Sequence, residues 1–455
     1  MRIFLLIWLA QLISTIGSRM SNFALVLWAW DLTGSPTALT LVAFFSRLPR
    51  IPITLFAGVV VDRYRRKQLM LLGDSIAALS TLGIALLYLT DALQLWHLYL
   101  AAALNGGFGQ IQSLAYRASV SLLVPKTQLT RANSLSISVG YGSNILGPAL
   151  AGLLYPLIGL LGILWIDLAT FGGAIALLLL SPIPHPPSQP NSKPTPLLSQ
   201  LTVGFRYVWQ KPSLRSLLLI TTAFWFFHDL GEAVYDPMIL ARTNGNAQVL
   251  ASVGAAAGIG GVTGAIGLSL WGGPKQRVRG LLSGFIGAGL SKIVFGLGRA
   301  PQVWIPAQVC SSLNFPLLGS SANALWMESI PAAIQGRVFA ANSLAVQSVS
   351  ALAVLLAGPL ADRLLEPAMM SGGGLTGWLA LSFGNGAGAG MAVLYTACAM
   401  AMLLVGIGGC FSSELQAIAG GARSAGADVC ESVSSDAVGD TTGGGDRGSS
   451  RRSRL

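Results

Sequence analysis

The sequence predicts an all-α polytopic membrane protein with twelve transmembrane helices in two pseudo-repeated six-helix halves. Three observations lead to this fold class. Of the 455 residues, 53% are hydrophobic and only 10% are charged, whereas a soluble domain carries about 25% charged residues. The apolar residues form long continuous runs, unlike the period-2 alternation of a membrane β-barrel. A Pro-rich polar segment separates six of these runs from six others.

Twelve runs are long enough to cross a bilayer, because a spanning helix needs about 20 mostly apolar residues. They cover residues 4–30, 37–61, 69–90, 95–122, 134–157, 160–181, 214–241, 247–271, 280–299, 303–328, 338–365 and 376–411. The first run resembles a signal peptide, but no small-residue cleavage site follows it, so we expect it to remain as the first helix. The start of the last run is indefinite because residues 371–390 are rich in glycine.

The polar segments divide the chain into four parts. We expect an N-terminal six-helix half at 1–181, a cytoplasmic Pro-rich linker at 182–213, a C-terminal six-helix half at 214–411 and a disordered cytoplasmic tail at 412–455. The prolines of the linker prevent a continuous helix and favour a semi-rigid spacer. The tail is rich in Gly, Ser, Ala and Asp and lacks apolar periodicity, which is typical of disorder.

The basic residues predict that both termini are cytoplasmic, since cytoplasmic loops carry an excess of Lys and Arg. With the N-terminus inside, 20 of the 28 basic residues fall on the cytoplasmic side and 3 on the other. Five fall within predicted spans, namely Arg19, Arg47, Arg50, Arg117 and Lys292. Topology therefore explains the net charge of +11. We expect the partner to be the lipid bilayer of a bacterial-type inner membrane and not a nucleic acid, which is bound by clustered basic residues.

Short sequences recur in both halves at nearly one offset. Pro125, Asn133 and Gly147 recur in the second half 206, 209 and 211 residues later, and Gly58 recurs 209 residues later at Gly267. Parallel repeats of six helices are typical of transporters, in which substrate binds near mid-membrane between two halves that rock against each other.

The loop after the second run reads Gly58-Val59-Val60-Val61-Asp62-Arg63-Tyr64-Arg65-Arg66-Lys67. It resembles the signature loop of the major facilitator superfamily, Gly-x-x-x-Asp-Arg-x-Gly-Arg-Arg/Lys, with Arg65 in place of the family's second glycine. The resemblance implies a conformational latch that closes the cytoplasmic side in the outward-open state, formed by Gly58, Asp62, Arg63, Arg66 and Lys67. Gly58 would permit close approach of helices 2 and 11, with Gly358 as a candidate neighbour. The alternative is a simple positive-inside anchor.

A second motif lies in the fifth run, where Gly147-Pro148-x-x-x-Gly152 resembles the antiporter motif of drug-exporting members of the superfamily. Its glycines and proline allow a kink and close helix packing. Together with the segments LVP-x-x-QLTRANSL, GRVFAANSL and GPLADR, it is similar to the subgroup of macrolide-efflux and enterobactin-type exporters. Lysophospholipid transporters are similar too. The Arg-x-x-Gln-Gly motif of proton-coupled drug exporters is absent from the fourth run.

Ionisable residues within a span are costly and are functional candidates. Asp229, Glu232 and Asp236 in the seventh run have the i, i+3, i+7 spacing of one helical face, and we expect a proton or substrate site there. Structural pairing is the alternative, for example of Asp229 with Arg19 or Lys292. Asp167 and Glu328 are expected to be structural. In the N-terminal half, the candidates for a cationic cavity facing this acidic helix are Arg19, Asn22, Arg47 and Arg117.

The sequence therefore predicts a secondary active transporter that exports a small amphiphilic compound (a drug, siderophore or peptide-like metabolite) by proton antiport with alternating access. The alternative is a lysophospholipid transporter, or flippase, of the same fold. An enzyme is not expected, because the chain has no nucleotide-binding loop, nucleophile elbow or metal pattern. We expect a monomer without cofactor or metal.

Overall fold

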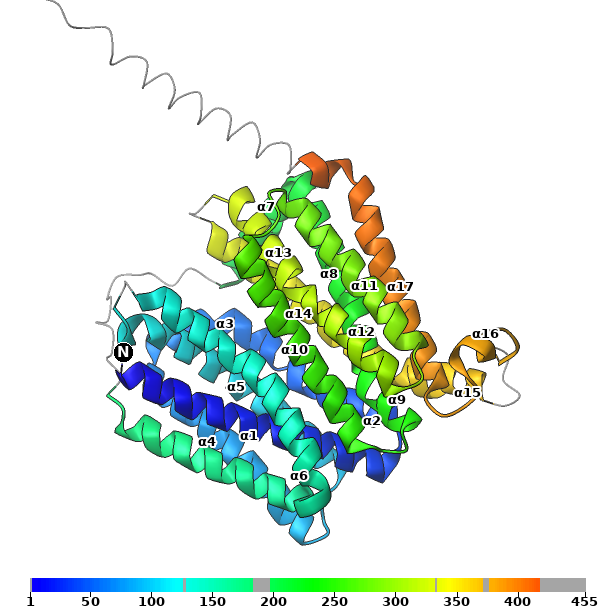
Figure 1. The fold of residues 1–455 in the computed structure, drawn as a ribbon. Coiled ribbons are helices and arrows are strands. Elements are labelled where there is room, and N and C mark those ends of the chain that lie inside the picture. The colour runs from blue at the N-terminus through cyan, green and yellow to red at the C-terminus, as the bar shows by residue number, and fades with distance from the viewer. Residues whose placement is uncertain (1, 126–127, 183–196, 332–333, 371–375, 418–455) are drawn as a thin grey trace, which may run out of the picture.

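A computed structural model of the chain describes residues 2–125, 128–182, 197–331, 334–370 and 376–417. Within these residues every regular element is helical (Figure 1). Nine segments of this part of the chain are long and apolar enough to cross a membrane. One of them, Arg131–Leu180, covers two spans, while α5 and the pair α12–α13 complete the twelve. The protein is thus an all-α multi-pass membrane protein.

Six spans of the N-terminal half come from elements α1 to α6. Their bounds are α1 Arg2–Thr33, α2 Pro36–Arg47, α3 Arg50–Arg63, α4 Arg66–Leu89, α5 Leu95–Leu123 and α6 Leu129–Leu180. The second span is divided into α2 and α3 at Pro49, because proline restricts the residue before it and lacks an N–H donor. Gly159 in α6 has φ 65° and ψ −173°, a conformation open to glycine, and the chain turns there from the fifth span into the sixth.

The C-terminal half has more interrupted spans. Its bounds are α8 Pro212–Ala233, α9 Tyr235–Arg242, α10 Ala247–Trp271, α11 Arg277–Leu297, α12 Pro301–Leu313, α13 Phe315–Ser329, α14 Gln335–Pro359, the π-helix η2 Leu360–Leu365, α15 Glu366–Met369, α16 Thr376–Phe383 and α17 Ala389–Phe411. The run expected at 376–411 is two helices, because Gly384 and Gly388 adopt positive φ between α16 and α17. The last span therefore begins at Ala389.

The segment expected to be a Pro-rich spacer contains a helix. In its proline-free part, between Pro196 and Pro212, the chain forms α7, Leu197–Gln210. Nothing after Pro196 interrupts the helix until Pro212, which starts α8. α7 packs closely on the start of α14, where Gly204 lies against Arg337 and Ala341. Residues 183–196 of the linker and 418–455 of the tail lie outside the described residues.

The helices have two ends that the later sections refer to. We call the end at which α3 ends, α4 begins and α7 lies the linker end, and the opposite end, with residues 34–35, 90–94 and 243–246, the distal end. Figure 1 shows the two bundles meeting near α2 and α9 and diverging toward the N-terminus and α7. Between the halves, α6 packs along α10 and α2 packs along α14.

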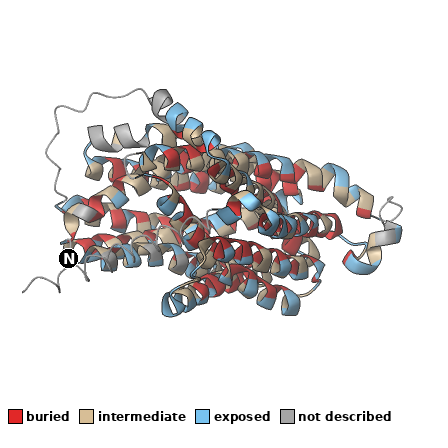
Figure 2. Cartoon of the chain, turned by 90° about the horizontal axis from the view of Figure 1, so that it is seen from above, coloured by how far each residue is buried: buried red, intermediate tan, exposed pale blue. Residues whose placement is uncertain are grey.

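Burial follows the pattern of a protein in lipid. Buried residues fill the interior of the bundle, and exposed residues lie at its periphery (Figure 2). The exposed residues include large apolar side chains such as Leu180, 81% exposed, and Leu270, 85% exposed. A soluble protein seldom exposes so many large apolar groups together. The outer surface therefore suits a bilayer.

Candidate functional site

The two halves are joined most closely by small residues toward the distal end. Gly152 of α6 packs on Ala251 of α10, and a Cβ at Gly152 would lie 3.3 Å from the Ala247 carbonyl oxygen. One turn earlier, Pro148 lies against Gly254 of the same helix. Gly147 instead faces its own half, where it packs against Arg19 of α1. The motif Gly147, Pro148 and Gly152 thus sets close contacts both within one half and between the halves.

A second inter-half contact joins α2 to the end of α14. Gly358 packs on Thr37 and Thr40, and a Cβ at Gly358 would lie 2.6 Å from the Thr37 Cα. The expectation that Gly358 lies near Gly58 is therefore wrong. The chain enters α2 at the distal end and leaves α3 at the linker end, while α14 runs the opposite way. The two glycines consequently lie at opposite ends of the helix pair.

Asp362 of η2 caps helix α2 from the other half. Its Oδ2 accepts hydrogen bonds from the Ser35 hydroxyl at 2.7 Å and from the Thr37 N–H at 2.9 Å. Pro36 has no N–H, so Thr37 carries the first unpaired donor of α2, and Ser35 makes no capping bond of its own. A carboxylate at a helix N-terminus also interacts favourably with the helix dipole. The hydrogen bonds of Asp362 therefore join the two halves at the distal end.

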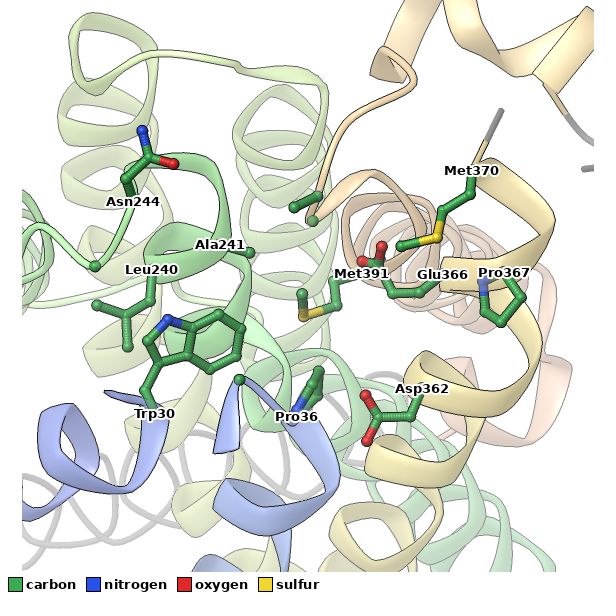
Figure 3. Close-up of a pocket in the computed structure, with 14 residues that line it drawn as sticks. Trp30, Pro36, Leu240, Ala241, Asn244, Asp362, Glu366, Pro367, Met370 and Met391 are labelled. Atoms are coloured by element: carbon green, nitrogen blue, oxygen red, sulfur yellow. The ribbon is translucent and has the colours of Figure 1, made fainter. Parts of the chain in front are cut away.

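A pocket of about 440 Å³ lies beside this contact (Figure 3). Trp30 and Pro36 come from the N-terminal half, while Asp362, Glu366 and Met391 come from the other. The Glu366 carboxylate accepts a hydrogen bond from the Met391 N–H at 3.1 Å, near the start of α17. Both carboxylates of the pocket thus bind helix starts, one in each half.

At mid-span an ion pair crosses between the halves. Arg47, the last residue of α2, lies 3.7 Å from the Asp229 carboxylate of α8. Asp229 is 8% exposed and also lies 3.3 Å from His228 Nδ1, and it bonds to Ser350 of α14. The Arg47 Nη1 atom is buried without a hydrogen-bond partner in the described part of the chain. Asp229 therefore pairs with Arg47 and not with Arg19 or Lys292, the partners considered from the sequence.

The other candidates of the N-terminal half lie around this pair or apart from it. Arg19 and Asn22 lie about one turn apart on α1 and are exposed although they are mid-span. The charges of Arg19 and Arg47 act on Arg50, so these three cations are neighbours. Arg117 is exposed nearer the linker end of α5. In the structure the neighbouring cations are thus Arg19, Arg47 and Arg50, whereas Arg117, which was expected to join them, lies apart.

Glu232, whose side chain is 35% exposed, pairs with a buried group inside the C-terminal half. The ammonium of Lys292, on α11, donates to the Glu232 carboxylate at 2.7 Å and to the Tyr395 hydroxyl at 3.1 Å. Lys292 is only 3% exposed, and its ammonium lies 5.2 Å from the centre of the Tyr395 ring. The sequence pointed to Lys292 as a charge within a span but did not identify Tyr395, because an aromatic residue in an apolar run has no distinguishing pattern.

Asp236 stands on a different helix from the other two acids. α8 ends at Ala233, and Asp236 lies in the first turn of α9, directly before Pro237. An acid is favourable in a first helical turn because the unpaired N–H groups carry partial positive charge. The face expected to join the three acids is thus interrupted at Val234.

The latch loop begins at the end of α3. Gly58, Asp62 and Arg63 lie on α3, but their side chains are outside what the structure describes. Arg66 donates to the Ala118 carbonyl at 2.6 Å, and Lys67 donates to the carbonyls of Leu179 and Ser181 at 2.8 and 3.0 Å. These two cations therefore hold the linker ends of α4, α5 and α6 together within one half.

Sequence comparison relates this chain to a known family and to named transporters. The sequence model of the Major Facilitator Superfamily matches residues 7–354. Macrolide efflux protein A of Streptococcus pyogenes is 27% identical over 79% of this chain and 90% of its own length. Multidrug efflux pump Tap of Mycolicibacterium fortuitum is 26% identical over 79% of this chain and 89% of its own length.

Solved structures agree on the fold. The crystal structure of a bacterial homologue of the iron transporter ferroportin in an inward-facing state covers 92% of this chain and 98% of its own, with a TM-score of 0.66 and 15% identity. The crystal structure of the POT family transporter PepTSo covers 92% of this chain and 98% of its own, with a TM-score of 0.68 and 12% identity. The match of the family sequence model over most of the chain, on a fold of two six-helix halves, shows that the protein is a transporter of the major facilitator superfamily.

Proposed function

We propose that this transporter exports small amphiphilic compounds from the cytoplasm by proton antiport, with its two halves alternating between two arrangements. The observation that carries the proposal is the Arg47–Asp229 ion pair, which bridges the halves at mid-span. A charge pair between two moving bodies forms in one arrangement and breaks in the other. A proton or a cationic substrate that competes for Asp229 therefore biases the position of the halves.

The names of the relatives support the substrate class. The relatives reported above are called macrolide and multidrug efflux proteins, and macrolides are bulky amphiphiles. The lysophospholipid alternative gains no such support. Aromatic side chains lie beside His228, the neighbour of Asp229: the rings of Phe224, Trp225 and Phe315 have their centres 6.3, 5.1 and 5.0 Å from the His228 ring centre. Such a site suits an apolar compound with few polar groups.

The contacts between the halves support alternating access. The contacts described above lie at the distal end, at Asp362, Gly358 and Gly152, and at mid-span, at Arg47. If the linker end faces the cytoplasm, as the basic residues indicate, this arrangement is closed to the outside. Export then requires the distal contacts to open. The protein would be a monomer in a bacterial inner membrane with both termini in the cytoplasm.

Transport in everted membrane vesicles tests the function. We expect vesicles that contain the protein to accumulate radiolabelled erythromycin when a proton gradient, acidic inside, is imposed. Empty-vector vesicles are the control. Because antiport draws its energy from the gradient, collapse of the gradient with nigericin should abolish accumulation. Accumulation that persists after collapse would show that proton antiport is wrong, and no accumulation of erythromycin would reject the macrolide-like substrate.

The cross-half pair has its own test. We expect Asp229→Asn to lose gradient-driven accumulation, because the variant can neither take up a proton nor hold Arg47 by charge. Arg47→Met should lose it too, and the double variant should be no worse than either single one, since residues of one interacting pair are not additive. The measurement is initial uptake rate in the same vesicles.

A matched control is available on the surface. Arg215 of α8 and Glu414, three residues after the end of α17, form an ion pair of 3.8 Å, with side chains 39% and 41% exposed. Glu414→Gln should transport normally, because exposed pairs contribute little. Normal gradient-driven transport by Asp229→Asn would remove Asp229 from the coupling mechanism.

A further inference from the structure

Two buried carboxyl groups of the N-terminal half take no part in the site described above. Asp74, on α4, is 5% exposed, and Asp167, in the sixth span, is 1% exposed. Burying an ionised carboxylate is costly unless a cation or several hydrogen bonds compensate for the lost water. Asp229 and Glu232 have Arg47 and Lys292 for this purpose. In the described part of the chain neither Asp74 nor Asp167 forms an ion pair; the pairs there involve other acids.

The partners of these carboxyls are neutral groups that both donate and accept hydrogen bonds. Gln11 and Gln112 donate to the two oxygens of Asp74 at 3.4 and 3.2 Å, and Gln112 also donates to the Gln11 amide oxygen at 2.8 Å. A Cβ at Gly73 would lie 2.5 Å from Gln112 Cβ, so this glycine permits the approach of α5 to Asp74.

Asp167 is held in the same manner by hydroxyl groups. Ser18 of α1 donates to its Oδ1 at 3.3 Å, and Thr81 of α4 donates to its Oδ2 at 3.2 Å. Gly17 packs directly on Asp167 and brings α1 against the sixth span. The carboxyl is therefore enclosed by α1 and α4 without a cation.

Donor–acceptor partners differ in kind from the partners of Asp229. A guanidinium can only donate, so it holds a carboxylate in its charged form. An amide or a hydroxyl donates to a charged carboxylate and, after a rotation, accepts the O–H of a neutral one. The surroundings of Asp74 and Asp167 thus accommodate both protonation states without a change of helix positions.

The two carboxyls are connected along one face of α1. Gln11 and Ser18 are seven residues apart on α1, and Asp74 and Thr81 are seven apart on α4. Seven residues are about two turns, or about 10 Å along a helix. Ser14, only 4% exposed, lies between Gln11 and Ser18 on the same face. A row of buried and half-buried polar groups therefore runs lengthwise through the half, with Asp74 nearer the linker end and Asp167 nearer the distal end.

The other titratable groups on α1, α4, α5 and α6 bond to other residues, are exposed, or lie toward the distal end. Three of them have other partners: Arg66 bonds to Ala118, Lys67 to Leu179 and Ser181, and Tyr116 to Ser136. Four are exposed, namely Arg19, Asp31, Arg117 and Arg131. The remaining four lie on the distal parts of their helices, namely Tyr88, His97, Tyr99 and Tyr155. None of them bonds to either carboxyl in the described part of the chain.

We propose that Asp74 and Asp167 are proton-binding sites, and that the polar row between them on α1 carries the protons of the transport cycle through the N-terminal half. The role in the cycle rests on the proposed proton antiport, whereas proton binding itself does not. This proton path would lie inside one half and would act together with the cross-half pair of Arg47 and Asp229, at which a proton or a cationic substrate competes. Each residue is assigned independently and is judged by its own variant.

Proton binding is measured on the purified full chain, without substrate, by infrared spectroscopy during a pH titration. A protonated carboxyl shows a C=O stretch that disappears when the group ionises. We expect Asp74→Asn and Asp167→Asn each to remove one titrating carboxyl band from the spectrum of the wild type. An unchanged set of bands in either variant overturns the assignment for that residue, whatever the transport assay shows.

The transport role is measured with radiolabelled erythromycin in proteoliposomes. Each Asn variant should lose accumulation driven by a pH gradient and keep counterflow, in which labelled and unlabelled compound exchange without a gradient. A variant that keeps gradient-driven accumulation overturns the transport role of its residue. If the wild type itself ignores the gradient, the proposed antiport fails, and the infrared result still decides proton binding.

A second pair of variants covers the case in which an Asn variant does not fold. Gln112→Met and Thr81→Val keep each carboxyl and remove one donor–acceptor partner. We expect the corresponding carboxyl band to titrate at a different pH. Glu328→Gln, an exposed carboxyl at the linker end with a side chain 51% exposed, is the control and should leave both bands in place. Unchanged titration in the partner variants overturns the proposal.

Discussion

Glu232→Gln is expected to lower the stability of the protein more than any other single neutralisation considered above. The variant keeps the shape of the side chain but leaves the Lys292 ammonium, with a side chain 4% exposed, without its 2.7 Å counter-ion. The variant leaves the buried ammonium uncompensated, but the Glu232 side chain is 35% exposed and its charge is partly screened, so the cost should be below the about 3–5 kcal/mol of a fully buried pair. The Tyr395 hydroxyl at 3.1 Å offers only a neutral acceptor in its place. The measurement is the midpoint of thermal unfolding in detergent.

Two further variants test whether the lost stability comes from the unpaired Lys292 charge or would follow from the loss of any carboxylate. Glu232→Gln combined with Lys292→Met removes both charges and should recover much of the loss, since replacing both partners of a buried pair is often close to neutral. Glu328→Gln breaks the Arg277–Glu328 pair, whose side chains are 40% and 51% exposed, and should change stability by about 0–1 kcal/mol. If Glu232→Gln unfolds at the wild-type midpoint, Lys292 does not depend on Glu232.

Gly358→Val is expected to hold the two halves apart at the distal end. A Cβ at this position would meet the backbone of Thr37 at 2.6 Å, and a backbone atom cannot move aside as the end of a flexible side chain can. Overpacking of this kind costs about 1–3 kcal/mol. The cost applies only when the halves are in contact, so the ratio of closed to open distal ends should fall about 5- to 150-fold. Transport should fall with it.

The position of the halves can be measured by spin labels. Cysteines replacing Leu32 of α1 and Leu381 of α16, both exposed near the distal end, report the separation in a chain whose native cysteines are replaced. Gly358→Val should lengthen the distance. Gly267→Val is the matched control, because a Cβ at Gly267 meets nothing within 4 Å. An equal effect of both variants would show that the loss of glycine, and not the contact at Thr37, is responsible.

The spans themselves were predictable because each depends on local composition. The breaks within them were less so. Pro49 indicates the division between α2 and α3 in the sequence. The interruption at Val234, in contrast, has no proline or glycine at the break itself. The helix α7 differs from the expected spacer because a proline restricts only its immediate neighbours, and residues 197–211 of the linker contain none.

Pairing was the part that could not be predicted. The sequence shows which ionisable residues lie within spans, but their partners depend on how helices far apart in the chain cross. Asp229 meets Arg47 across 182 positions, and Lys292 meets Glu232 across 60. Asp74 stood in an apolar run with no motif around it, and its neighbours Gln11 and Gln112 lie on two other helices. Only the packing of α1, α4 and α5 reveals the group.

The cap that Asp362 provides makes the start of one helix depend on the other half of the molecule. The Thr37 amide is bound by a residue 325 positions away in the chain, and α2 has no capping bond from Ser35 to replace it. Whenever the halves separate at this end, that amide must turn to water and the first turn of α2 should fray. Hydrogen–deuterium exchange at Thr37 would then record each opening in the unmodified protein. Because the Asp362 carboxylate protects the Thr37 amide only while the halves are in contact, exchange of this one amide reports the opening of the distal end without an added label.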